Sequence, residues 1–221
     1  MMLSRLAPAA IALAVAGGVG WWALSPSGTS GLPQVAGPAE AQSATEADFV
    51  RVPDMALGDP DAPVTVIEYA SFTCPHCATF HAQVYPELVR DYVETGKARI
   101  EVREVYFDRV GLWAGMLARC GGEDRYFGLI SLLLSRQAEW SRSDDLLGAF
   151  QSLGRQAGLS DAEVEACLTD ADGQRALVEM YQGYYDDPLL TGTPTLVVAG
   201  RKIDNPSFRN LSAAIDDALG G

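Results

Sequence analysis

The sequence predicts an α/β domain in which a β-α-β unit and a β-β-α unit are separated by a long helical block. Three observations predict this order. A β-branched and aromatic stretch at 64–72 is followed by a helical pattern and by a second apolar stretch at 99–106. A helical pattern then extends over 111–185, and a hairpin and a final helix complete the chain. Strand, helix and strand in succession indicate a parallel strand pair.

The composition is that of a globular protein with an acidic surface. Of the 221 residues, 48% are hydrophobic and 20% are charged, and the formal net charge is −13. Neutralising phosphates requires clustered Lys and Arg, so this balance argues against a nucleic-acid partner. The length allows one domain of ordinary size with an additional segment.

The N-terminal residues form that additional segment. Leu6–Leu24 carries no charge, follows Arg5 and ends near Trp21 and Trp22, and the next basic residue is Arg51. About 20 apolar residues cross a bilayer as a helix, tryptophan favours the interface, and the positive residue stays in the cytoplasm. We therefore expect 1–24 to be an inner-membrane anchor, with the rest of the chain on the far side of that membrane from the cytoplasm. Cleavage as a signal peptide is the alternative.

Composition divides the remainder of the chain. Residues 25–47 are rich in Gly, Pro, Ser and Ala, contain no aromatic residue and predict a flexible linker. We expect 48–110 and 186–221 to form the α/β domain, and 111–185 to form an inserted helical subdomain.

Local residue patterns predict two strands and a helix in the first half of the domain. Val64–Phe72 predicts a strand, and Arg99–Tyr106 predicts the strand that pairs with it. Between them, Pro86 should kink the helix and Gly96 should end it. The apolar face of this helix is formed at four-residue steps by Phe80, Val84 and Leu88.

The second half follows the helical block. Ser160 to Glu163 form a capping box that predicts a helix over Val164–Leu168. Thr195–Val198 and the residues after Ala199-Gly200 predict a hairpin. Pro206 is expected to open a last helix that runs to Leu219. Its inward face is predicted to carry Phe208, Leu211 and Ile215.

The sequence Cys74-Pro75-His76-Cys77 lies where the first strand gives way to the helix. Free N–H groups and the helix dipole at this position favour a thiolate on Cys74. Pro75 suits the first helical position, and His76 can add positive charge or a hydrogen-bond donor. Cys77, one turn later, can resolve a mixed disulfide. A Cys-x-x-Cys pair at this place in a βαβ unit predicts thiol–disulfide exchange.

Two other interpretations of the cysteine pair are weaker. Zinc or copper would need further soft ligands, and only His81 lies on the same helix, so we expect no metal or other cofactor. A purely structural bridge would close a loop too short to contribute much stability.

Together, VIEYASFTCPHC, the helical insertion and GTPTLVV resemble the DsbA-like thiol–disulfide oxidoreductases of the bacterial envelope over about Asp48 to Leu219. The resemblance implies a thioredoxin-like fold with an inserted helical subdomain. It implies that Thr193 and Pro194 form a cis-proline loop beside the cysteines. It also implies that Glu68 is a buried acid that shuttles a proton to Cys77. His81 matches no family role and is interpreted as an ordinary helix residue.

The resemblance further implies an oxidant, because the family stabilises the thiolate corresponding to Cys74 by the helix start and by the residue corresponding to His76. Substrates would be unfolded or partly folded exported proteins, and a quinone-linked membrane oxidase of the DsbB type would reoxidise a monomeric enzyme in the periplasm. The alternatives are an envelope isomerase or reductant on the same fold, and a membrane-tethered metal-binding or chaperone module.

Cys120 and Cys167 both fall in the predicted helical subdomain. In an oxidising compartment they suggest a structural disulfide, and some DsbA-like proteins carry an extra bridge of this kind. Two separately buried thiols are the alternative.

Overall fold

The computed structural model describes residues 53–220, which lie within one compact unit. The predicted anchor or signal segment, 1–24, and the predicted linker, 25–47, lie outside the described residues. Among the helices of 53–220, none combines the length and apolar character needed to cross a bilayer.

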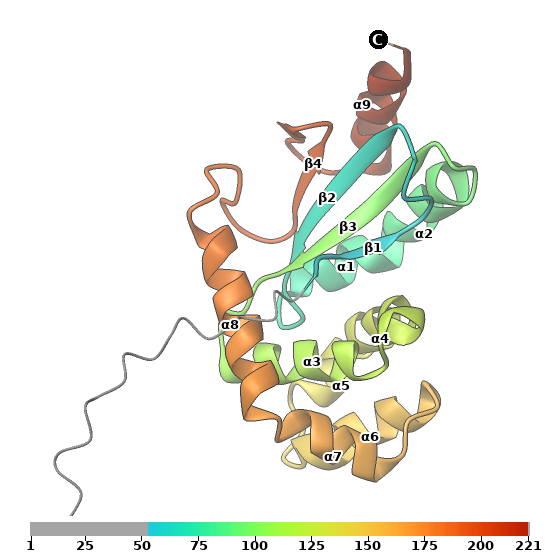
Figure 1. The fold of residues 1–221 in the computed structure, drawn as a ribbon. Coiled ribbons are helices and arrows are strands. Elements are labelled where there is room, and N and C mark those ends of the chain that lie inside the picture. Colours follow the sequence, from blue (N-terminus) through green and yellow to red (C-terminus); the bar gives the residue numbers. More distant parts are fainter. Residues whose placement is uncertain (1–52, 221) are drawn as a thin grey trace, which may run out of the picture. The chain divides into compact units, whose positions relative to one another are not determined.

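The framework of the fold is a mixed five-stranded sheet in the order β1-β3-β2-β4-β5 (Figure 1). β2 is central: it pairs parallel with β3 and antiparallel with β4. The predicted parallel β-α-β unit and the hairpin are therefore confirmed. The strands are β1 (Met55–Leu57), β2 (Val64–Ala70), β3 (Ala98–Glu104), β4 (Thr195–Val198) and β5 (Arg201–Lys202).

The short edge strand β1 was not predicted from the sequence. It is three residues long and pairs antiparallel with β3, with Met55 opposite Val102. Three residues are too few to show a two-residue alternation, so only the neighbouring strand reveals this one.

Helices connect the strands and build the insertion. Figure 1 shows α3 to α7 grouped below the sheet, with α8 rising from this group along one side of the sheet. The helical segments are α1 (Pro75–Gln83), α2 (Tyr85–Leu88), the π-helical η1 (Val89–Val93), α3 (Arg109–Cys120), α4 (Glu123–Ser135), α5 (Gln137–Trp140), α6 (Leu146–Gln156), α7 (Asp161–Leu168), α8 (Ala171–Tyr185) and α9 (Phe208–Gly220).

Some predicted helix boundaries are corrected. The single kinked helix after the cysteines is divided into α1, α2 and η1, with the break at Val84. Pro86 lacks the N–H that would continue the helical ladder across this break. The insertion begins at Arg109 because Asp108 caps α3 by accepting a hydrogen bond from the Gly111 N–H. The last helix begins at Phe208, two residues after Pro206.

Side-chain alternation along β2 decides which residues meet α1. Val64, Val66 and Ala70 belong to the main core, together with Phe80 of α1 and Ile215 of α9. Tyr69 belongs to a separate cluster on the opposite face of the sheet. Glu68 has the same parity as Val66 and Ala70, so its side chain points toward α1.

A buried polar cluster joins the insertion to the sheet. Glu104, at the end of β3, is fully buried. Its carboxylate accepts hydrogen bonds from Arg119 Nε at 3.0 and 3.1 Å and from the hydroxyls of Tyr106 and Tyr126. These contacts tie α3 and α4 to the central sheet, because burial of an unpaired carboxylate would be costly.

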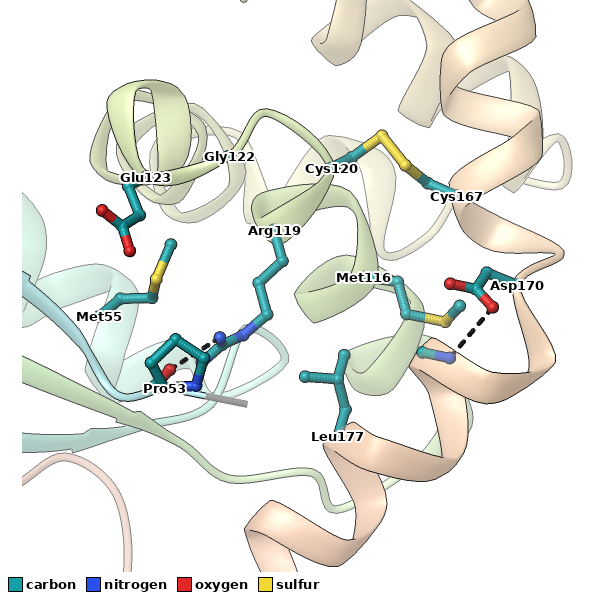
Figure 2. A pocket seen from close by; sticks show the side chains of 11 residues that line it. Pro53, Met55, Met116, Arg119, Cys120, Gly122, Glu123, Cys167, Asp170 and Leu177 are labelled. Atoms are coloured by element: carbon teal, nitrogen blue, oxygen red, sulfur yellow. Dashed lines mark hydrogen bonds between the residues drawn. A yellow bond between two sulfur atoms is a disulfide. The ribbon is translucent and has the colours of Figure 1, made fainter. Parts of the chain in front are cut away.

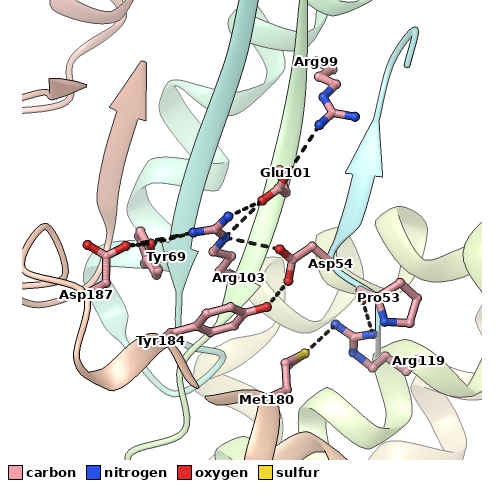
Figure 3. Close-up of polar contacts among 10 residues, drawn as sticks. All are labelled: Pro53, Asp54, Tyr69, Arg99, Glu101, Arg103, Arg119, Met180, Tyr184 and Asp187. Atoms are coloured by element: carbon pink, nitrogen blue, oxygen red, sulfur yellow. Dashed lines mark hydrogen bonds and ion pairs between the residues drawn. The ribbon is translucent and has the colours of Figure 1, made fainter. Parts of the chain in front are cut away.

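A second polar cluster lies on the opposite face, around Arg103 of β3 (Figure 3). Arg103 donates to the Tyr69 hydroxyl at 2.8 Å and to Glu101 at 2.8 and 3.0 Å, and its Nε lies 3.3 Å from Asp54 Oδ2. Tyr184 of α8 donates to Asp54. The cluster therefore connects the start of β1 to the sheet and to α8.

Candidate active site

Cys74 is the N-cap residue of α1, with extended backbone angles (φ −84°, ψ 117°), and Pro75 follows at the first helical turn. The sulfur is half-buried and its S–H donates to the Thr193 carbonyl oxygen at 3.2 Å. A sulfur at this position faces the unpaired N–H groups of the helix start. The predicted placement of Cys74 and Pro75 is the one observed.

Cys77 lies one turn further along and is completely buried. Its sulfur accepts a hydrogen bond from the Ser71 N–H at 3.4 Å. Burial, with a further contribution from the Glu68 carboxylate, raises the pKa of the Cys77 thiol. Cys74 and Cys77 are not bonded to each other in this structure. The half-buried sulfur can attack, whereas the buried one needs a base before it can do so.

The Thr193-Pro194 peptide bond is cis and lies beside Cys74, as the resemblance implied. An open groove runs past this loop and is lined in part by His76, Phe80, Pro194 and Pro206. His76 itself is exposed. The groove also includes Thr193, whose carbonyl oxygen accepts from Cys74.

Glu68 and His81 form a buried pair, which corrects the interpretation of His81 as an ordinary helix residue. His81 Nε2 lies 3.0 Å from Oε1 and 3.1 Å from Oε2 of Glu68. The Glu68 side chain is fully buried and that of His81 is 4% exposed. The expected burial of Glu68 is confirmed. The sequence signal for its partner is a histidine four residues after Cys77, on the face of α1 that packs against β2.

Gln137 of α5 is a site residue that the sequence analysis missed. Its side-chain amide is buried and donates to the carbonyl oxygens of Phe72 at 2.7 Å and Cys74 at 2.9 Å. The insertion therefore contacts the backbone that carries the Cys74 sulfur. In the sequence, Gln137 is one polar residue among others in the predicted helical subdomain 111–185, and no local pattern singles it out.

Cys120 and Cys167 are joined by a disulfide that connects α3 to α7. Figure 2 shows it at the edge of a pocket that is also lined by Met55, Arg119 and Leu177. The bridge lies in the insertion, away from the Cys74–Cys77 pair. The structure thus favours the bridge over two separate thiols.

The Nε2 atom of His81, the candidate metal ligand on the helix after the cysteines, is directed at Glu68. Within residues 53–220, the structure brings together no group of three His, Cys, Asp or Glu side chains suited to holding a metal ion.

Comparisons with known proteins agree with this geometry. A family model described as thioredoxin (Thioredoxin_4) matches residues 51–217. A Rickettsia bellii protein named as a protein-disulfide oxidoreductase is 35% identical over 167 residues, which are 75% of this chain and 64% of that protein. The chain therefore spans less than two thirds of the length of this relative.

Two further comparisons cover more of the related protein. Disulfide bond formation protein D of Bacillus subtilis is 34% identical over 75% of this chain and 77% of its own length. The crystal structure of Wolbachia pipientis alpha-DsbA1 superposes with a TM-score of 0.70 at 27% identity, and the match covers 76% of this chain and 91% of that one.

Proposed function

This chain belongs to the DsbA-like family of thioredoxin-fold disulfide oxidoreductases, and we propose that it introduces disulfide bonds into exported proteins through Cys74 and Cys77. The observation that carries the proposal is the position of the Cys74 sulfur. It lies at the start of α1, half-buried and next to the cis-Pro194 loop, with Cys77 buried one turn away.

The reaction would proceed by two exchanges. A substrate thiolate attacks Cys74 Sγ, the Cys74–Cys77 bond breaks, and its electron pair remains on Cys77, which takes up a proton. A second substrate thiolate then attacks the substrate sulfur of the mixed disulfide and releases Cys74 as a thiolate. The helix start stabilises that leaving thiolate, and His76 is assigned a contribution of the same sign.

The surroundings of the pair suggest what it would act on. The groove along His76, Phe80 and Pro194 suits an extended, unfolded chain, whose backbone could bond to the Thr193 loop. Returning to the oxidised form requires an acceptor for two electrons, and a quinone-linked membrane oxidase of the DsbB type is the partner we assign to this step.

We place the enzyme outside the cytoplasm, in the periplasm. The Cys120–Cys167 disulfide supports this placement, because such bridges persist in oxidising compartments. The apolar segment 6–24, with Arg5 before it, is consistent with export and with anchoring to the inner membrane.

The test is the redox equilibrium of the full-length protein with glutathione, combined with its ability to oxidise a reduced, unfolded protein such as ribonuclease A. An oxidase should show a potential nearer to about −120 mV than to about −270 mV and should form disulfides in the substrate. A value near the lower limit would instead assign the chain to the reductant alternative. Cys74→Ser should abolish the exchange, and Arg90→Gln, an exposed change on η1, should preserve it.

A further inference from the structure

A second cavity opens between the helical segments α1 to η1 and helix α4. Its volume is about 710 Å³, and its walls include His81, Tyr85, Glu94, Phe127 and Ser131. It is separate from the groove that passes the cis-Pro194 loop. The proposed exchange chemistry uses only that groove, so this second cavity has no role in it.

Two buried polar atoms on the cavity walls have no hydrogen-bond partner within the described residues. They are His81 Nδ1 and the Tyr85 hydroxyl oxygen. The two rings stack with centroids 4.3 Å apart and an interplanar angle of 16°, which holds the imidazole in place. Because burial of an unpaired polar group is costly, both atoms are expected to bond to water in the cavity.

His81 therefore connects two environments. Its Nε2 lies against the Glu68 carboxylate, its Nδ1 is buried without a partner among the described residues, and the residue itself lines the cavity. Cys77 lies one helical turn before His81 on α1, and both are buried on the side of α1 that meets Glu68 of β2. The Glu68–His81 pair therefore lies between the part of α1 that carries Cys77 and the cavity that His81 lines.

Resting on the proposed function, we propose that His81 relays protons between Glu68 and water in this cavity, so that Cys77 exchanges its proton through the rear of the site. His81 is a positioning and proton-transfer residue for Cys77 in this scheme. It does not touch the substrate. Glu68 alone cannot complete the path, because its side chain is fully buried.

Over one catalytic cycle, the proton transfers return every group of the relay to its starting protonation state. When the Cys74–Cys77 bond breaks, water gives a proton to His81 Nδ1, Nε2–H gives its proton to Glu68, and Glu68 protonates the Cys77 thiolate. When the enzyme is reoxidised, the Cys77 thiol protonates Glu68, Glu68 protonates Nε2, and Nδ1–H returns its proton to water. The imidazole ends each cycle in its starting tautomer, so no ring rotation is needed.

The titratable groups in contact with His81 are Glu68 from β2 and Tyr85 from α2, and Glu94, which follows η1, lines the same cavity. Burial and the Glu68 carboxylate raise the pKa of Tyr85, so its hydroxyl stays neutral and can bond to water. Helix α4 contributes Phe127 and Ser131, neither of which competes for a proton near neutrality.

The test separates the two steps of enzyme oxidation. Reduced protein is mixed with oxidised glutathione. The first phase forms the Cys74–glutathione disulfide, and the second is the attack of Cys77, which closes the bridge and releases glutathione. His81→Gln, which can still bond to Glu68, should slow the second phase by about tenfold or more near pH 7. The reverse reaction should slow equally, leaving the equilibrium with glutathione near that of the wild type.

Chemical rescue and a blocked cavity complete the experiment. Free imidazole should restore part of the second phase to His81→Ala, because the cavity admits it. Gly128→Trp should also slow the second phase, since Gly128 lines the cavity and an added Cβ there has open space. The same change at the exposed Gly183 of α8, also in open space, is the matched control.

A second phase at the wild-type rate in His81→Gln would overturn the relay while leaving the proposed function intact. A shifted equilibrium with unequal changes in the two directions would also overturn it, since that result marks a structural role. Failure of the wild-type protein to react with any disulfide would instead refute the proposed function.

Discussion

Gln137 and Cys74 are joined across the boundary between the helical insertion and the sheet domain. The Gln137 side-chain amide donates to the Cys74 carbonyl oxygen at 2.9 Å and to the Phe72 carbonyl oxygen at 2.7 Å. The Cys74 carbonyl also accepts from the Cys77 and Ala78 N–H groups of the first turn of α1. The insertion is therefore hydrogen-bonded directly to the loop that positions the candidate attacking sulfur.

Gln137→Leu should loosen that loop. It leaves the buried Phe72 carbonyl without its side-chain donor, and we expect the free energy of unfolding to fall by about 1–3 kcal/mol. The reaction of Cys74 with oxidised glutathione should slow as the sulfur loses its fixed position. Urea unfolding and stopped-flow kinetics measure the two effects. Gln156→Leu, at an exposed amide on α6, is the control, and equal losses in both variants would contradict the assignment.

His76→Ala should weaken the oxidant. Histidine beside the start of α1 is assigned a share in stabilising the Cys74 thiolate, and loss of that share should shift the equilibrium with glutathione toward the disulfide form by about tenfold, or about 30 mV. The measurement is the ratio of reduced to oxidised enzyme over a series of glutathione buffers. Gln83→Ala, also exposed on α1, should leave this ratio unchanged. An unaltered equilibrium in His76→Ala would refute the role.

Asp54 should make stability depend on pH in the mildly acidic range. Burial, and next a hydrogen bond with Glu101, raise its pKa to about 6 from 3.8, although Arg103 acts in the opposite direction. Between these two values the folded state binds more protons than the unfolded state. The free energy of unfolding should therefore decrease as the pH rises through this window.

Asp54→Asn should remove that slope. Urea unfolding at several pH values between about 4 and 6 measures it. Asp61→Asn, at an exposed carboxylate in the turn before β2, should leave the slope in place. If the free energy of unfolding of the wild-type protein instead rose with pH across this window, and Asp54→Asn abolished the rise, the explanation would be wrong.

Removal of the Cys120–Cys167 bridge should destabilise the fold without altering the redox pair. Its sequence separation of 47 residues corresponds to an upper estimate of about 4 kcal/mol for the double variant Cys120→Ala/Cys167→Ala. Thermal unfolding measures this loss, and the glutathione equilibrium of Cys74–Cys77 should be retained. Mass spectrometry of alkylated, unreduced protein provides an independent check. Free thiols at both Cys120 and Cys167 would contradict the bridge.

Much of the fold was predictable because it depends on local sequence. The capping box at Ser160 forms as predicted, with Glu163 bonded back to the Ser160 N–H. Ala199 and Gly200 both adopt positive φ between β4 and β5, as a two-residue type I′ hairpin turn requires. Helix boundaries were less predictable: Asp108 and Val84 decide where α3 starts and α1 ends. Those boundaries follow from a cap and a backbone break that periodicity does not register.

By itself, the sequence determined the order of the elements and the position of Cys74-Pro75-His76-Cys77 at the start of a helix, since both depend on neighbouring residues and on side-chain period. Only the tertiary structure decided which buried polar groups meet. Glu68 faces His81 because one side of β2 lies against one side of α1, and Gln137 reaches Cys74 because the insertion packs against that junction. Such contacts depend on how elements dock, and an unpaired buried polar group is costly enough that docking must satisfy it.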